Sequence, residues 1–113
     1  RAHKAGVKIA CGTDSGTPFN YHGSLPIEMM LLKKIGLSNM EILTCATKSS
    51  AECTGSEKNY GTIEEGKFAD FLVLKDNPVE NMETIFDIED VYKLGNKVER
   101  KFNHPANVKE YLV

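Results

Sequence analysis

An apolar run that leads into a turn of small residues constrains this chain more than any other feature. The run begins at Val7 and ends in the turn Gly12-Thr13-Asp14-Ser15-Gly16. A short apolar run bounded by glycines is typical of a buried parallel strand. A strand of that kind needs neighbouring strands at its edges and helices on both faces. The sequence therefore predicts an α/β arrangement in which Asp14 lies where a strand meets solvent.

Asp14 has two possible roles at this position. As a carboxylate at the end of a parallel strand, it could bind a metal ion or accept a proton. As an ordinary loop aspartate, it would accept hydrogen bonds from the backbone of its own turn. The pattern of this stretch alone favours the second role, because such turns are common.

Composition excludes several classes of function. The chain has 113 residues, enough for one modest domain, and 14 Lys and Arg against 16 Asp and Glu give a net charge of −2. This balance argues against a nucleic-acid partner, and no apolar run has the length of a membrane span. Three cysteines are too few for a secreted disulfide framework, so we expect a reduced, cytoplasmic setting and small buried roles for Cys45 and Cys53.

Two helical segments follow the Asp14 turn. Helical spacing of apolar residues predicts a helix over Ser24–Ile35, with Gly36 as its stop. Ser38 and Glu41 form a capping-box signature that predicts the start of a second helix. We expect this helix to turn Met40, Leu43 and Ala46 inward, to be interrupted at Lys48-Ser49-Ser50, and to close at Gly55.

The second half of the chain has the signals of short antiparallel strands. Strands are predicted at Gly61–Ile63 and Phe68–Leu74, and a hairpin is predicted around Gly95-Asn96 between Glu89–Leu94 and Lys97–Phe102. Asp70 is unusual inside a strand, and we expect it to accept backbone hydrogen bonds from the preceding turn rather than to act in catalysis. Residues 103–113 are predicted to form a short helix or a loose tail.

The order of these motifs resembles the C-terminal end of proteins of the amidohydrolase superfamily, in particular the imidazolonepropionase-like and Xaa-Pro dipeptidase-like hydrolases. The motifs extend over about residues 5–100, and their order and spacing are more specific than Gly-Thr-Asp alone. They are Gly12-Thr13-Asp14-Ser15-Gly16, His22-Gly23, Glu28, Ala46-Thr47, Ser50-Ala51, Gly61 to Leu74, Asn77-Pro78 and Val91 to Val98.

The resemblance implies a definite layout. Residues 1–58 would be the end of a metal-dependent (β/α)8 TIM barrel, with Val7–Thr13 as its last strand. Residues 59–103 would be strands of the small β-sandwich domain that flanks the barrel, and residues 104–113 a C-terminal tail. Asp14 would match the family's metal-binding and catalytic aspartate, which reverses the preference stated above, and His22 would contact substrate.

The same comparison shows what this chain lacks. It contains only three histidines (His3, His22 and His104), and none of them forms the family's His-x-His pair. One carboxylate cannot hold a catalytic zinc, which usually has three protein ligands. We therefore expect a fragment of a larger hydrolase. The full-length parent would bind a divalent metal such as Zn²⁺ and cleave a carbon–nitrogen bond of a small molecule or dipeptide, and the piece alone would be inactive and without bound metal.

Two other interpretations stay open from the sequence. The chain could be a non-catalytic binding or assembly module that pairs with another chain. It could also be a small enzyme that uses Asp14 as a base and His22 as its orienting partner, although nothing supplies a nucleophile or an oxyanion site. Exposed strand edges and an uncovered helix face also predict self-association of the isolated chain.

Overall fold

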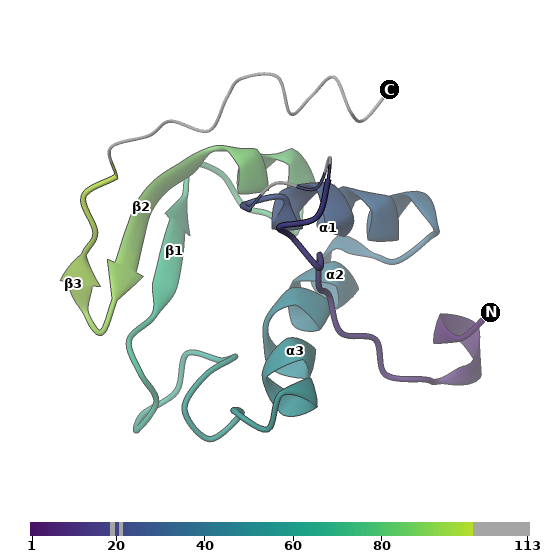
Figure 1. Cartoon of the computed structure of the whole chain (residues 1–113), viewed down its shortest axis with the longest axis horizontal. Coiled ribbons are helices and arrows are strands. Elements are labelled where there is room, and N and C mark those ends of the chain that lie inside the picture. The colour runs from purple at the N-terminus through teal and green to yellow at the C-terminus, as the bar shows by residue number, and fades with distance from the viewer. Residues whose placement is uncertain (19, 21, 101–113) are drawn as a thin grey trace.

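The computed structural model describes residues 1–18, 20 and 22–100, and the predicted tail lies outside this range. Helices and a small antiparallel sheet make up two sides of the molecule, and the N-terminal segment lies on the helix side (Figure 1). The chain is therefore α/β, as the sequence predicts. The elements in order are the 3-10 helix η1 (His3–Ala5), α1 (Leu25–Lys34), α2 (Asn39–Ala46), α3 (Lys48–Cys53), β1 (Phe71–Leu74), the 3-10 helix η2 (Met82–Phe86), β2 (Ile88–Lys93) and β3 (Asn96–Lys97).

The helices begin close to where the sequence predicts them. Ser38 and Glu41 form the predicted capping box, in which the Glu41 carboxylate accepts from the Ser38 amide at 2.8 Å. The predicted interruption at Lys48–Ser50 is wrong, because the break falls at Thr47 and these residues open α3. Thr47 has φ −122° and ψ −85°, which is not helical, so the polar run simply starts a new helix.

The buried core joins α1, α2 and η2. Ile42 and Met82 are fully buried, and the other buried members of this cluster are Met29, Leu37, Cys45 and Ile85. Met40 was expected inward but is 55% exposed, because the core-facing residues of α2 are Ile42 and Cys45. Cys53 was also expected to be buried, and it is exposed.

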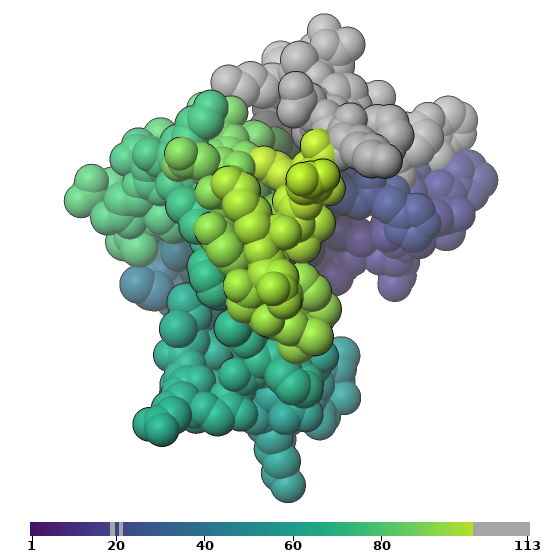
Figure 2. Space-filling model, turned by 90° about the vertical axis from the view of Figure 1, so that its left-hand side faces the viewer, coloured from purple at the N-terminus to yellow at the C-terminus, as the bar shows by residue number. Residues whose placement is uncertain are grey.

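The three strands form one antiparallel sheet in the order β1-β2-β3, and the yellow-green residues of its β2–β3 end lie in the middle of the face in Figure 2. Phe71 lies opposite Tyr92, and their rings stack with centroids 4.6 Å apart. Lys93 pairs with Asn96, so the two-residue turn is Leu94-Gly95 and the predicted turn at Gly95-Asn96 is shifted by one residue. Both turn residues have positive φ (50° and 77°), as the favoured hairpin turns require.

Two predicted strands are not formed. The stretch 7–14 and residues 61–63 contain no strand, and the paired part of Phe68–Leu74 is only Phe71–Leu74. Stretch 7–14 has no strand beside it within the described residues, and Cys11 instead bonds to the end of α2. Gly61 packs against α3, while Ile63 is 89% exposed. Strand propensity alone does not create a ladder, because each strand needs a partner.

Asp70 stabilises the sheet through its side chain. The Asp70 carboxylate accepts from the Leu94 amide at 2.8 Å and forms an ion pair with Lys93. Lys93 is the last residue of β2 and Leu94 lies in the turn that follows it, so the expected bond to the preceding turn is wrong. Lys93 and the Leu94 amide lower the pKa of Asp70.

Within the part of the chain that the structure describes, every helix is too short or too polar to cross a membrane.

Candidate functional site

The stretch that leads to Asp14 is fastened to the helices by one serine. The Ser50 hydroxyl lies between two carbonyl oxygens, at 3.0 Å from that of Cys11 and 2.7 Å from that of Cys45. The Cys11 amide donates to the Cys45 carbonyl at 3.1 Å. Residues 7–14 are therefore held against the junction of α2 and α3 at Cys11, while Val7 is 56% exposed.

Asp14 lies in solvent-exposed backbone just beyond this attachment. Its φ is +47°, a conformation that Asp and Asn tolerate better than most residues. The following turn is organised by Asn20, whose side-chain amide donates to the Thr13 carbonyl and accepts from the Ser24 hydroxyl at 3.0 Å. The Gly16 amide donates to the Asn20 carbonyl at 2.8 Å.

Asn20 was not predicted from the sequence as a residue of this site. Its side chain joins the residue before Asp14 to the residue before α1, so it fixes both ends of the loop. The available signal was its amide group, which can donate and accept at once. An asparagine in a loop is too common for that signal to be decisive.

His22 lies in the same loop as Asp14. Its Nδ1 is 3.2 Å from the Ser15 hydroxyl, and its ring lies close to Gly16. Among the described residues, no hydrogen bond joins His22 to Asp14. The structure therefore brings both predicted site residues into one exposed loop but does not pair them as base and orienting partner.

The donor atoms around Asp14 do not make a metal site by themselves. Residues 1–18, 20 and 22–100 contain no group of three or more His, Cys, Asp or Glu side chains placed to hold an ion. Burial raises the pKa of the Cys11 thiol to about 11, and the Glu28 carboxylate and the Cys45 thiol add to this. Cys11 is therefore a protonated thiol near neutral pH, which is a poor metal ligand and a poor nucleophile.

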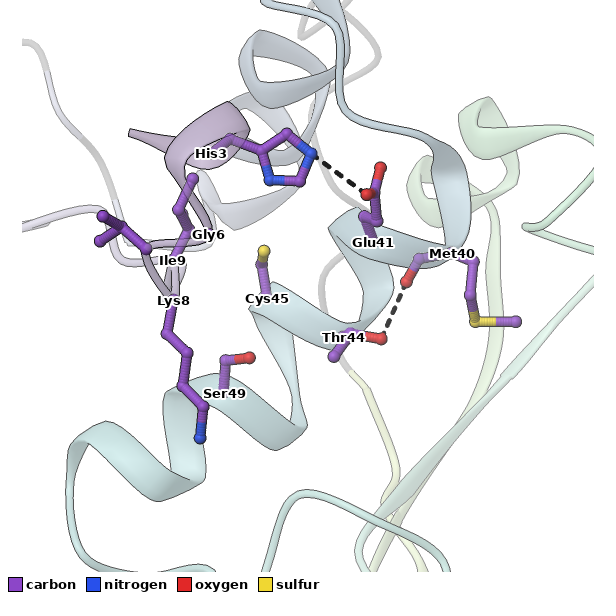
Figure 3. Close-up of a pocket in the computed structure, with 10 residues that line it drawn as sticks. His3, Gly6, Lys8, Ile9, Met40, Glu41, Thr44, Cys45 and Ser49 are labelled. Atoms are coloured by element: carbon purple, nitrogen blue, oxygen red, sulfur yellow. Dashed lines mark hydrogen bonds and ion pairs between the residues drawn. The ribbon is translucent and has the colours of Figure 1, made fainter. Parts of the chain in front are cut away.

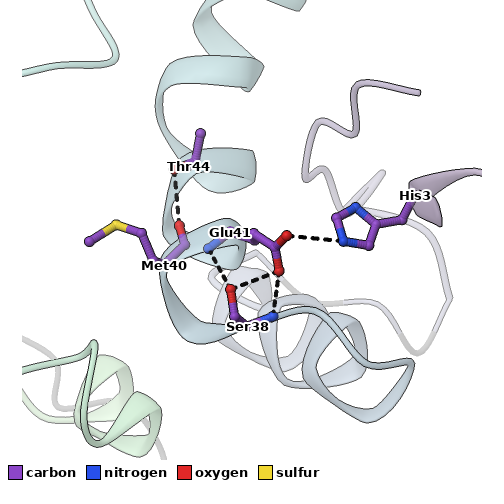
Figure 4. Close-up of polar contacts among 5 residues, drawn as sticks. All are labelled: His3, Ser38, Met40, Glu41 and Thr44. Atoms are coloured by element: carbon purple, nitrogen blue, oxygen red, sulfur yellow. Dashed lines mark hydrogen bonds and ion pairs between the residues drawn. The ribbon is translucent and has the colours of Figure 1, made fainter. Parts of the chain in front are cut away.

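A pocket of about 320 Å³ lies away from the Asp14 loop, between the N-terminal segment and α2 (Figure 3). The residues that line it are His3, Gly6, Val7, Lys8, Ile9, Met40, Glu41, Thr44, Cys45 and Ser49. Its wall includes a polar contact between His3 Nε2 and Glu41 Oε1 at 3.1 Å (Figure 4). The Ser38 hydrogen bonds, followed by His3, lower the pKa of Glu41. Glu41 is therefore occupied in capping α2 and in holding η1.

Comparison with known proteins identifies the family. The model of the Amidohydrolase family matches residues 1–98. A protein named probable imidazolonepropionase from Nematostella vectensis is 39% identical over 92 residues, which cover 80% of this chain and 19% of that protein. The chain therefore spans about a fifth of the length of this curated relative.

Solved structures agree with this assignment. A structure described as a putative prolidase from Bifidobacterium longum has a TM-score of 0.87 and 33% identity, with 98% of this chain and 28% of that chain covered. A Xaa-Pro dipeptidase with bound methionine in its active site has a TM-score of 0.79 and 34% identity, with 88% and 24% covered. This chain belongs to the amidohydrolase family.

Proposed function

We propose that this chain is the C-terminal part of a metal-dependent hydrolase that cleaves a carbon–nitrogen bond. The family match over residues 1–98 carries this proposal, because it includes the Asp14 turn and the whole region that follows. The imidazolonepropionase and dipeptidase relatives support a small cyclic amide or a dipeptide ending in proline as the substrate class.

In this proposal residues 1–58 belong to the end of a (β/α)8 TIM barrel, residues 59–103 to a flanking β-sandwich, and residues 104–113 to a tail. The stretch 7–13 would become a strand once the preceding barrel strands lie beside it. Its attachment at Ser50 and the exposure of Lys8, Ala10 and Gly12 support this, because parallel strands need neighbours.

Asp14 is the proposed metal-binding and catalytic residue, and His22 the proposed substrate contact. The described residues alone do not fit a metal ion, so a divalent cation such as Zn²⁺ would need further ligands from outside this chain. Asp14 would supply one carboxylate ligand and a proton acceptor. Its position in an exposed turn fixed by Asn20 is compatible with that role.

The proposal can be tested in a longer protein in which this chain follows the remaining strands and helices of the barrel. We expect Asp14→Asn to lower metal-dependent hydrolysis of an Xaa-Pro dipeptide or a cyclic amide by about 10²–10⁴-fold, the usual value of a positioned acid or base. Asp87→Asn makes the same chemical change at an exposed carboxylate distant in sequence and should leave the rate within twofold. Equal rates for Asp14→Asn and the unmodified protein would overturn the role of Asp14.

A second candidate function is an assembly module that binds another chain or a second copy of itself. Exposed apolar side chains favour it, since Ile35 is 72% and Ile63 89% exposed, and among the described residues no strand pairs with the outer edge of β1. Sedimentation of the 113-residue chain decides between this role and an inactive monomer. If self-association is absent at high concentration, the exposed faces do not serve this purpose.

A further inference from the structure

The direction of the Asp14 carboxylate is set by its backbone rather than by side-chain contacts. Within the described part of the chain it has no hydrogen-bond or ion-pair partner, whereas Lys93 and the Leu94 amide hold the Asp70 carboxylate. The φ of +47° at Asp14 belongs to a sparsely populated region for residues other than glycine. Such conformations persist only where the surrounding structure holds them, and they cluster at functional sites. A neighbouring group must therefore hold the backbone at Asp14.

Asn20 supplies this hold from the far end of the loop. Its side-chain amide donates to the Thr13 carbonyl, which shares one planar peptide group with the Asp14 amide. Fixing that carbonyl therefore fixes the plane from which Asp14 departs. The backbone of Asn20 is itself anchored, because its amide donates to the Thr17 carbonyl at 3.0 Å and its carbonyl accepts from the Gly16 amide at 2.8 Å.

The oxygen of the Asn20 side chain is held by a hydroxyl that would ordinarily serve a helix. Ser24 is the N-cap residue of α1, a position where serine usually accepts a hydrogen bond from the first turn. Here its side chain makes no capping bond and instead donates to Asn20 Oδ1 at 3.0 Å. The hydroxyl thus orients the Asn20 amide so that its nitrogen faces Thr13. Departures of this kind from a local rule are expected at functional sites.

We propose that Asn20 is a positioning residue for Asp14 and that Ser24 keeps Asn20 in the required orientation. This inference rests on the proposed hydrolytic function, in which Asp14 supplies its carboxylate to the reaction. Asn20 acts through Thr13 and not by contact with substrate. It keeps Asp14 in its positive-φ conformation, so that the carboxylate needs no rearrangement when substrate binds.

The test uses the longer protein described above, with whichever of the two substrate types it hydrolyses. We expect Asn20→Ala to lower kcat by about 10–100-fold while KM changes by less than about threefold. Asn20→Asp keeps the acceptor for Ser24 but loses the donor to Thr13, so it should lower kcat at least as much. Asn59→Ala is the matched control and should leave kcat within about twofold, the scatter of a neutral surface change. Asn59 is an exposed loop asparagine whose side chain has no hydrogen-bond partner among the described residues.

Double variants separate positioning from a general effect on the loop. If Asn20 acts through Asp14, Asn20→Ala should cause little further loss in the Asp14→Asn protein, because residues that act as a unit are not additive. Ser24→Ala should likewise lower kcat in the unmodified protein but not in Asn20→Ala. A merely structural Asn20 would lower activity by the same factor whether or not Asp14 is present, and that result would overturn the proposal.

Hydrogen exchange tests the same hold without substrate. The Gly16 amide bonds to the main-chain carbonyl of residue 20, so its exchange rate reports the order of the loop, and it should rise in Asn20→Ala but not in Asn59→Ala. Unchanged exchange, or unchanged kcat where Asp14→Asn is strongly impaired, would overturn the role of Asn20 and leave the hydrolytic function standing. Absence of hydrolysis, or equal rates for Asp14→Asn and the unmodified protein, would overturn the proposed function and with it the role of Asn20.

Discussion

The Asp14 region (residues 7–24) and the region from α2 to β3 (residues 39–97) are stabilised in different ways. In the second region, apolar side chains such as Ile42 and Met82 are fully buried, and three strands form one hydrogen-bonded sheet. In the Asp14 region none of the described residues is buried, Ile9 and Cys11 only flank the buried cluster, and hydrogen bonds from Ser50 and Asn20 hold the rest of the stretch.

This difference separates structural residues from candidate functional ones. The α2–β3 region finds its contacts within this chain, which explains why its capping box, hairpin and buried cluster form here. The Asp14 region has exposed backbone and few neighbours, as expected of a segment whose remaining contacts come from other parts of a larger protein. The candidate functional residues therefore lie in the region that depends least on contacts within this chain.

The contact between Gly61 and α3 gives the largest predicted effect on the α2–β3 region. A Cβ at Gly61 would lie 2.7 Å from that of Ala51 and 3.2 Å from the Lys48 Cα, and its φ is +96°. We expect Gly61→Ala to lower the free energy of unfolding by about 2–4 kcal/mol, measured by urea denaturation.

Gly66→Ala is the matched control for this prediction. Gly66 has a similar φ of +87°, but a Cβ there meets nothing within 4 Å. Only the backbone cost of about 1–2 kcal/mol should appear. Equal losses of unfolding free energy in the two variants would show that the packing of Gly61 on α3 contributes nothing. The α2–β3 region would then depend less on contacts within this chain than we infer.

Ser50 allows the comparison to be tested from the other side, because it joins the two regions. Ser50→Ala leaves the carbonyls of Cys11 and Cys45 without their shared donor in a partly buried site. We expect a loss of about 1–3 kcal/mol in unfolding free energy and faster hydrogen exchange of the Cys11 amide.

Ser49→Ala serves as the control for Ser50→Ala. Ser49 lies in the same helix and lines the pocket, and alanine is the better helix former, so this variant should be neutral or slightly more stable. If the Cys11 amide exchanges its hydrogen equally fast in both variants, Ser50 does not hold residues 7–14 against the helices.

Local signals in the sequence predict much of the fold. The Ser38–Glu41 box, the α1 helix and the hairpin signal near Gly95 are all encoded within a few residues, and each leads to the expected kind of element. The burial of Met82 and Ile85 could not be predicted, because η2 has no periodic pattern and its position depends on α1.

The strand errors have a different cause. Val7–Thr13 and Gly61–Ile63 have the composition of strands, yet a strand exists only where a partner offers its backbone groups. For the candidate site, the sequence predicts that Asp14 and His22 belong to one loop, but not that Asn20 organises it. The positive φ of Asp14 and the bond to Thr13 follow from the folded loop rather than from a residue pattern.

The ion pair of Asp70 predicts a pH dependence confined to the sheet side of the comparison. Lys93 and the Leu94 amide lower the pKa of Asp70 below its usual value of 3.8. A lowered folded-state pKa contributes stability above the unfolded value, and this contribution is lost as the pH falls through the folded value. The difference in stability between the unmodified chain and Asp70→Asn should be constant near neutral pH and shrink below about pH 4.

Asp76→Asn is a suitable control, because Asp76 is an exposed loop carboxylate whose bonds lie outside the β2–β3 turn. Urea denaturation at several pH values measures both variants. If the difference for Asp70→Asn stays the same down to the lowest pH at which the chain folds, the carboxylate does not stabilise the turn in its charged form.

The smallest predicted change in unfolding free energy comes from the turn at Leu94. This turn contains a residue that does not suit its backbone conformation. Leu94 has φ +50°, which is costly for leucine, and its side chain is 55% exposed. Leu94→Asn should raise the unfolding free energy by about 0.5–1 kcal/mol. Asparagine tolerates this conformation, and the hydrogen bond from the backbone amide of residue 94 to Asp70 is retained. Leu94→Ala removes the same exposed side chain without easing the backbone, so it should bring no gain. If the unfolding free energy rose equally in both variants, the cause would be the loss of exposed apolar surface. The backbone conformation at Leu94 would then carry no cost, and the turn would suit its sequence as the capping box of α2 does.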